Sequence, residues 1–171
     1  MRNQFANTAL LLVALAVSTE GSSQPSKPTR SPSPEKTETK EQVEARFTVV
    51  AKDILQDSKT SLQWTVADNG KDIDWPGAHR RCADMGSNWR LPTRGELMDL
   101  LHPKLRSKCG SNMCFSTEKL RLTGSHVWSS ETTGESPVPK GATIVLFELG
   151  NTFVAKATWG EGQRALCVRP A

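Results

Sequence analysis

The sequence lacks several patterns that would indicate an enzyme or a metal protein. No Gly-x-Ser-x-Gly motif is present, so the nucleophile turn of an α/β-hydrolase is not predicted. The three histidines, His79, His102 and His126, are scattered along the chain. The cysteine pair Cys109 and Cys114 is not followed by a second Cys/His pair with the spacing of a zinc finger. We therefore expect no catalytic residue, no metal and no cofactor.

Long apolar runs are also missing, apart from a short one at the N-terminus. Ala9 to Val17 is unbroken, but it holds only nine residues, and roughly twenty are needed to span a bilayer. Arg2 precedes the run, and the small residues Ala16 and Ser18 suit a cleavage site. We predict a secretory signal peptide over residues 1–20, cut near Ser18, and no membrane span after cleavage.

Aliphatic residues are scarce after this run. Residues 21–45 are rich in Ser, Pro, Thr, Lys and Glu, and Val43 is the only Val, Leu or Ile among them. Such a segment buries too little apolar surface to offset the entropy lost on ordering. The sequence predicts a disordered linker over residues 21–45 and one folded domain over residues 46–171.

The charge balance is modest, with a formal net charge of +4. This value does not indicate a nucleic-acid partner, and we expect none. Nine basic residues nevertheless lie between Arg80 and Arg121, against four acidic ones. The cluster predicts a basic face, although an ordinary solvated face remains the alternative. The candidate anion-binding residues are Arg80, Arg81, Arg94, Lys104, Arg106 and Lys108.

Two short helices are expected near the middle of the chain. Asp74 is a suitable N-cap for the first, whose apolar residues recur at helical spacing up to Met85, and Gly86 suits its end. Thr93 and Glu96 form a capping box for the second, which runs to about residue 101.

Strands are expected on both sides of these helices. Alternating or β-branched segments occur at residues 46–51, 60–66, 127–130, 142–149, 152–157 and 164–169. Gly150-Asn151 fits a two-residue hairpin turn between two of them, and the apolar strand 142–149 should be central in its sheet. Residues 104–123 are polar and expected to be irregular. The predicted fold class is α+β.

Four cysteines in an exported chain predict disulfides. Three pairings are open on the sequence alone. A tight loop favours Cys109 with Cys114, which leaves Cys82 with Cys167.

Five segments together resemble one protein family. The first, Asp57-Ser58-Lys59-Thr60-Ser61-Leu62-Gln63-Trp64, is similar to its opening strand Asp-x-x-Thr-Gly-Leu-x-Trp, with Ser61 where glycine is usual. The others are Trp75-x-x-Ala78-x-x-x-Cys82, Trp89-Arg90-Leu91-Pro92-Thr93-x-x-Glu96-Leu97, Val127-Trp128-Ser129-Ser130-Glu131 and Ala165-Leu166-Cys167-Val168-Arg169. They cover about residues 53–169 and resemble the C-terminal domain of Legionella collagen-like adhesins, the Lcl C-terminal domain. We expect structural roles for Trp64, Trp75, Trp89, Arg90, Pro92, Thr93, Glu96, Leu97 and Trp128.

The resemblance implies a fold similar to C-type lectins and formylglycine-generating enzymes, with a long-loop region between Leu101 and Gly141. It supports the pairing of Cys82 with Cys167. Members occur on exported bacterial proteins, which implies the periplasm or the extracellular side. The namesake's domain is associated with adhesion and sulfated polysaccharide, but this chain lacks the collagen-like Gly-x-y repeat.

Two functions follow as expectations. The first is a non-enzymatic binding module for an anionic polysaccharide or an acidic protein surface. The alternative is a protein-partner role in the envelope, as an inhibitor, immunity protein or assembly subunit. A calcium lectin site is not expected, because Trp128-Ser129-Ser130-Glu131 supplies one carboxylate where several oxygens are needed. A formylglycine-generating type of enzyme is also not expected, because all four cysteines have structural uses. The oligomeric state is not specified.

Overall fold

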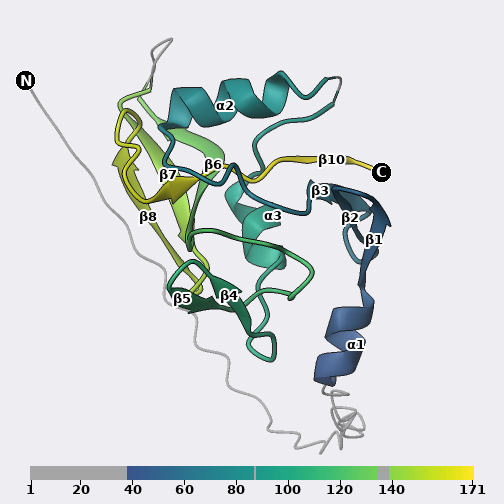
Figure 1. The fold of residues 1–171 in the computed structure, drawn as a ribbon. Helices are drawn as coiled ribbons and strands as arrows, with labels where there is room; N and C mark the ends of the chain where they lie inside the picture. Colours follow the sequence, from purple (N-terminus) through teal and green to yellow (C-terminus); the bar gives the residue numbers. More distant parts are fainter. Residues whose placement is uncertain (1–37, 87, 135–138) are drawn as a thin grey trace, which may run out of the picture. The chain divides into compact units, whose positions relative to one another are not determined.

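The computed structural model describes residues 38–86, 88–134 and 139–171, which belong to a unit that starts at Lys36. The predicted signal peptide and linker residues 21–37 lie outside the described residues. The fold is α+β, as predicted (Figure 1). In chain order the elements are α1 Lys40–Ala45, β1 Phe47–Ala51, β2 Ile54–Asp57, β3 Leu62–Thr65, α2 Trp75–Ala83, α3 Arg94–Asp99, β4 Ser107–Cys109, β5 Asn112–Cys114, β6 His126–Thr133, β7 Gly141–Leu146, β8 Asn151–Lys156, β9 Gln163–Arg164 and β10 Val168–Pro170.

Two four-stranded sheets and one hairpin form the β structure of the described residues. The first sheet has the order β1-β2-β3-β10, the second has β8-β7-β6-β9, and β4 pairs with β5. All pairs are antiparallel except β6 with β9. The strand β7 lies inside its sheet, as its apolar sequence predicts. The helix α3 lies between the two larger sheets in Figure 1 and packs against β6 and β7.

Several motif residues lie in the core. Trp64, Leu97 and Trp128 are fully buried, and Trp89 is 7% exposed. Trp64 is paired with Val168 across β3 and β10, and the backbone of Arg90 bridges to Val168 from the other side. The segment that contains Trp89 and Arg90 is thereby fixed to the last strand, which explains why these motifs occur together.

Both disulfide pairings that the sequence favours are confirmed. Cys82 is bonded to Cys167, with their Cα atoms 5.4 Å apart, and Cys109 is bonded to Cys114. The first bond joins α2 to the residue before β10. The second closes the β4–β5 hairpin. Disulfides of this kind are typical of exported proteins.

The helix starts follow the capping signals in the sequence. The Asp74 side chain accepts a hydrogen bond from the N–H of Gly77 at 2.8 Å. Thr93 and Glu96 form both bonds of the predicted capping box. After α2 the chain turns at Gly86, whose φ of +108° is in a region that glycine adopts without strain.

The prediction of a disordered linker up to residue 45 is wrong for residues 40–45, which form α1. Thr39 and Gln42 cap this helix reciprocally. Its one aliphatic side chain, Val43, is only 2% exposed and belongs to the core cluster with Phe47. Val43 in the core and Glu44, whose carboxylate accepts a hydrogen bond from the Thr117 hydroxyl, hold a segment whose composition alone suggests disorder.

Three strand predictions also need correction. The strand β7 ends at Leu146, which pairs with Asn151, so residues 147–150 replace the predicted two-residue turn. The cause is Phe147, which is fully buried and whose N–H donates to the Ser125 carbonyl at 2.8 Å instead of to β8. The predicted strand 164–169 is split into β9 and β10, which belong to different sheets. Within residues 104–123, β4 and β5 form a hairpin where an irregular segment was expected.

None of the helices in the described ranges has the length and apolar content that a membrane crossing needs.

Candidate anion-binding site

The structure does not bring all six predicted anion-binding residues together. Arg94, at the start of α3, lies 3.4 Å from the carboxylate of Glu131. The Lys104 ammonium donates to the backbone carbonyl of Glu38. These two cations therefore have partners of their own. The other four line two separate surface hollows, Arg106 and Lys108 in one and Arg80 and Arg81 in the other.

The larger hollow, which we call the hairpin hollow, has a volume of about 710 Å³. It is open to solvent and lies between the β4–β5 hairpin and the segment that precedes β6. Three cations line it, and one carboxylate, Glu118, opposes them. The lining residues are Arg106, Ser107, Lys108, Gly110, Met113, Glu118, Leu120, Arg121, Leu122 and Thr123.

The floor of this hollow is rigid. The hydroxyl groups of the buried Ser107 and Ser116 are 2.7 Å apart and hydrogen-bonded. Gly110 has a φ of +64°, and a Cβ there would lie 2.6 Å from the backbone oxygen of Thr123. Only glycine permits this close approach. The disulfide of Cys109 then fixes the same end of the hairpin.

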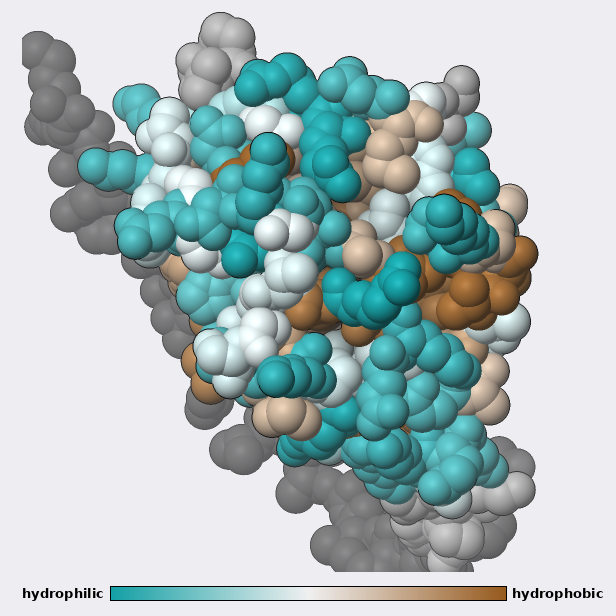
Figure 2. Space-filling view, viewed as in Figure 1, coloured by the Kyte–Doolittle hydropathy of each residue, from teal (hydrophilic) through white to brown (hydrophobic). Residues whose placement is uncertain are grey.

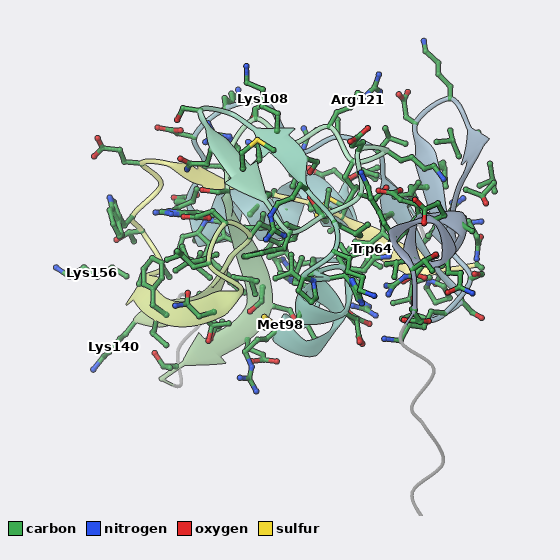
Figure 3. The ribbon with its side chains drawn as sticks, turned by 90° about the horizontal axis from the view of Figure 1, so that it is seen from below. Trp64, Met98, Lys108, Arg121, Lys140 and Lys156 are labelled. Atoms are coloured by element: carbon green, nitrogen blue, oxygen red, sulfur yellow. A yellow bond between two sulfur atoms is a disulfide. The ribbon has the colours of Figure 1, made fainter. Side chains whose placement is uncertain are left out.

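Its three cations are held in different ways. The Arg106 guanidinium lies 3.9 Å above the ring of Phe115 and donates to the carbonyl of Pro103 at 2.8 Å. The Arg121 side chain lies 3.5 Å from Asp53, but both groups are about two-thirds exposed, so this pair is weak. Lys108 makes no ion pair with any residue that the structure describes. Figure 3 shows Lys108 and Arg121 projecting from the same side of the domain.

The second hollow, which we call the helix hollow, lies beside α2 and has a volume of about 410 Å³. Its cations are Lys71, Arg80 and Arg81, and Asp84 opposes them. The remaining lining residues are Asn69, Ile73 and Gly77. A nearby carboxylate, Asp72, is already engaged. The Arg164 guanidinium donates to it at 2.6 Å, and this hydrogen bond holds the pKa of Asp72 below its usual value.

Two cations of the hollows were absent from the predicted set. Arg121 lies inside the basic cluster that the sequence shows, but no local pattern separates it from its neighbours. Lys71 lies before that cluster and reaches the helix hollow because the chain turns at Gly70, whose φ is +74°. Both Arg121 and Lys71 reach their hollows because of the course that residues 66–74 take through the folded domain.

A metal centre finds no support in the described part of the chain, where no three His, Cys, Asp or Glu side chains are grouped to hold an ion. Glu131 accepts a hydrogen bond from the backbone N–H of Arg94 at 3.2 Å. The linings of both hollows hold more cations than carboxylates.

The family model of the Lcl C-terminal domain matches residues 53–169. The chain belongs to this family. No curated protein matches the sequence.

In this Lcl C-terminal domain the motif residues have structural roles. Asp57 is fully buried and accepts hydrogen bonds from Arg46 at 2.7 Å and from the Thr60 hydroxyl at 3.0 Å. The Arg90 guanidinium binds both carboxylate oxygens of Glu96, at 2.7 and 2.8 Å. The cations of the hollows, in contrast, lie between the motifs or at their variable positions. The family motifs therefore describe the scaffold.

Proposed function

We propose that this domain is an exported, non-enzymatic binding module that holds anionic groups of a polysaccharide in the hairpin hollow. The observation that carries the proposal is the charge of that hollow, whose lining holds the cations Arg106, Lys108 and Arg121 and one carboxylate, Glu118. Lys108 in particular lacks a carboxylate partner among the described residues.

The chemistry of the lining supports this ligand class. An arginine guanidinium can donate two parallel hydrogen bonds to a sulfate or carboxylate, and lysine adds a mobile point charge. Met113, which is 56% exposed, supplies apolar surface in the same lining. A charged sugar has both features, because its anionic substituents project from a ring with apolar C–H faces.

Export and a C-type-lectin-like fold are parts of the same proposal. The disulfides support export through a signal peptide to the periplasm or the cell surface. The bond between α2 and the residue before β10 supports the lectin-like assignment, since this fold commonly ties its first helix to its last strand. A non-enzymatic role is supported by the cysteines, all four of which are in disulfides and leave none for redox catalysis.

The test is binding of the exported domain to a sulfated polysaccharide, with Lys108→Glu as the variant. The wild type should bind at low salt and lose affinity as salt rises, because exposed charges are screened beyond about 8–10 Å at physiological ionic strength. Lys108→Glu should reduce binding strongly with an unchanged melting temperature. Arg106 is a poor probe, because its packing on Phe115 also contributes to stability.

Lys156→Glu is the matched control, because it changes the net charge by the same amount. Lys156 is exposed on β8 and points to a different side from Lys108 and Arg121 in Figure 3. Equal loss of binding in both variants would show a non-specific charge effect and contradict the assignment of the hollow.

A protein-partner role is the second candidate, and the first sheet favours it. Val49 and Val50 on β1 are each about half exposed, at 50% and 51%. Figure 2 shows hydrophobic surface on the side where Figure 1 places this strand. Because β1 is the outer strand of its sheet, an extended strand of a partner protein can pair with it. Val49→Lys should remove such binding and leave polysaccharide binding intact.

A further inference from the structure

The two basic hollows are joined by a short stretch of paired backbone. Ala67 pairs with Arg121 in a parallel bridge, and the N–H of Arg121 donates to the Val66 carbonyl at 2.7 Å. Arg121 lines the hairpin hollow, and Lys71 lines the helix hollow. Lys71 follows Ala67 by four positions. At no more than about 3.3 Å per residue, with about 5 Å across the bridge, the Cα atoms of Arg121 and Lys71 lie within about 18 Å of one another.

The stretch between the hollows is fixed by Asp68, which is 6% exposed. Its carboxylate accepts hydrogen bonds from the N–H and hydroxyl of Thr123, at 2.6 and 2.8 Å, and from the N–H of Gly70 at 2.8 Å. Asn69 is also held, since its side-chain oxygen accepts from the N–H of Ala165 at 2.7 Å. The two hollows are thereby kept in a constant relative position.

Carboxylates along this stretch are occupied by the fold. Asp68 points its oxygens at Thr123 and Gly70, as described above. Asp72, the next one, is bound by Arg164, whose Nε also donates to the Thr123 hydroxyl at 2.8 Å. Glu118 and Asp84 belong to the linings of the two separate hollows. The path between the hollows therefore holds two carboxylates, Asp68 with hydrogen-bonded oxygens and Asp72 with an arginine partner, and it has cations at both ends.

We propose that the two hollows form one track for a linear anionic polysaccharide, with Lys108 and Arg121 binding one part of the chain and Lys71, Arg80 and Arg81 another. This inference rests on the proposed function of the hairpin hollow and adds the helix hollow to it. It also specifies the ligand: an extended polymer with repeated anionic groups, rather than a compact anion that fits into one hollow.

The arrangement predicts a strong dependence on chain length. A short fragment occupies one hollow at a time. A chain that reaches both hollows binds the second one at a high effective concentration, which raises affinity by about 100-fold or more over either site alone. One long chain should therefore occupy both hollows of a domain as a single tight site. A short fragment should instead bind weakly and independently in each of the two hollows.

The experiment is calorimetric titration of the full exported chain with one sulfated polysaccharide, as a disaccharide and as a long size-fractionated chain. Arg81→Glu removes a cation from the helix hollow, Lys108→Glu from the hairpin hollow, and Lys156→Glu is the control. Each of the first two variants should abolish one of the two disaccharide sites and weaken the long chain at least about tenfold. Lys156→Glu should change neither. Melting temperatures of all variants should equal that of the wild type.

The outcomes separate this inference from the function on which it rests. If Arg81→Glu leaves long-chain affinity unchanged while Lys108→Glu abolishes it, the track is refuted and the hairpin hollow remains the binding site. If Lys108→Glu has no effect, the proposed function fails as well. Equal affinity per anionic group for short and long fragments would also refute the track. Tighter binding of polyglutamate than of the polysaccharide would refute the ligand class.

Discussion

In the part of the domain that carries the family motifs, charged side chains have fixed partners, whereas around the hairpin hollow they are largely left to solvent. Arg90 is bound at two points by Glu96, and Asp57 is buried against Arg46. Lys108 and Arg121 have no comparable partner among the described residues, since the contact of Arg121 with Asp53 is exposed at both ends.

The difference shows where function should be sought on this scaffold. A buried charge that lacks a partner costs several kcal/mol, so the motif region retains only charges that the fold satisfies. An exposed cation has no such cost and is free to bind a ligand. The motifs identify the family because they are structural, and for the same reason they do not identify the ligand.

The largest expected effect is on the free energy of unfolding, and it compares the loss of each of the two disulfides, one of which lies in each region. Loss of the Cys82–Cys167 bond, by Cys82→Ser with Cys167→Ser, should lower the free energy of unfolding by about 4–5 kcal/mol in the chain-entropy model, because it opens a long loop. Loss of the Cys109–Cys114 bond should cost about 2 kcal/mol, because its loop is short. Urea unfolding of both double variants measures the difference.

For polysaccharide binding by the folded domain, we expect the opposite order, with the larger effect from loss of the Cys109–Cys114 bond. The Cys109–Cys114 bond fixes the hairpin that carries Lys108, so its loss should weaken binding while the domain stays folded. A variant without this bond that binds as tightly as the wild type would mean that the remaining hairpin contacts suffice to position Lys108.

The next effect concerns two tryptophans. Trp89 is 7% exposed with the Arg169 guanidinium 4.8 Å from its ring, so Trp89→Ala should cost about 3–5 kcal/mol. Trp159 is 46% exposed, and Trp159→Ala should change stability by about 0.5 kcal/mol or less. Thermal and urea unfolding of the pair measure this. A stable, folded Trp89→Ala protein would overturn the structural assignment of the motif.

The sequence predicts the helix caps and one disulfide well because their signals are local. The Thr93–Glu96 capping box, the Asp74 cap and the tight cysteine loop each depend on residues a few positions apart, and all three occur in the structure. The strand β2 escaped prediction because Asp57 at its end is polar yet fully buried, which breaks the usual alternation. Its partner Arg46 lies outside the motif.

The hollows could not be predicted in the same way. The hairpin hollow depends on contacts between distant segments, such as Gly110 against Thr123 and Asn112 with Ser125. Charge clustering drew attention to residues 80–121, but it grouped Arg94 and Lys104 with cations that lie elsewhere and omitted Lys71. Which cations share a surface is decided by tertiary structure, and net charge along the chain does not contain that information.

A smaller effect is expected for the Arg90–Glu96 pair, whose contribution to the free energy of unfolding should depend on pH. Hydrogen bonds from Arg90 are the main cause that lowers the pKa of Glu96 below its ordinary 4.5. A carboxylate with a lowered pKa stabilises the fold above its unfolded pKa, and this contribution is lost as the pH falls through the folded value. Arg90→Met should therefore cost about 1 kcal/mol at neutral pH, since the side chain is partly exposed, and the loss should shrink in acid.

The control for this pair is Lys59→Met, which removes an exposed contact with Asp99 at 3.3 Å. It should have little effect at any pH, because exposed pairs contribute about 0–1 kcal/mol. Equal losses in the two variants, measured by urea unfolding across the acid range, would show that the two-point binding of Glu96 adds nothing to stability.

The smallest effect is a gain, and it concerns the position where this chain departs from its family. Ser61 has a φ of +55°, a left-handed conformation that strains residues with a Cβ. The family's usual glycine adopts it freely. Ser61→Gly should raise the free energy of unfolding by about 0.5–1 kcal/mol, after the larger entropy of glycine in the unfolded chain is subtracted from the relieved strain. Asn88, with a φ of +73°, is the control, because asparagine tolerates this region better and Asn88→Gly should gain less. Thermal unfolding of both variants gives the comparison. A loss of stability in Ser61→Gly alone would show that the serine side chain makes a contribution in this motif larger than the strain of its backbone.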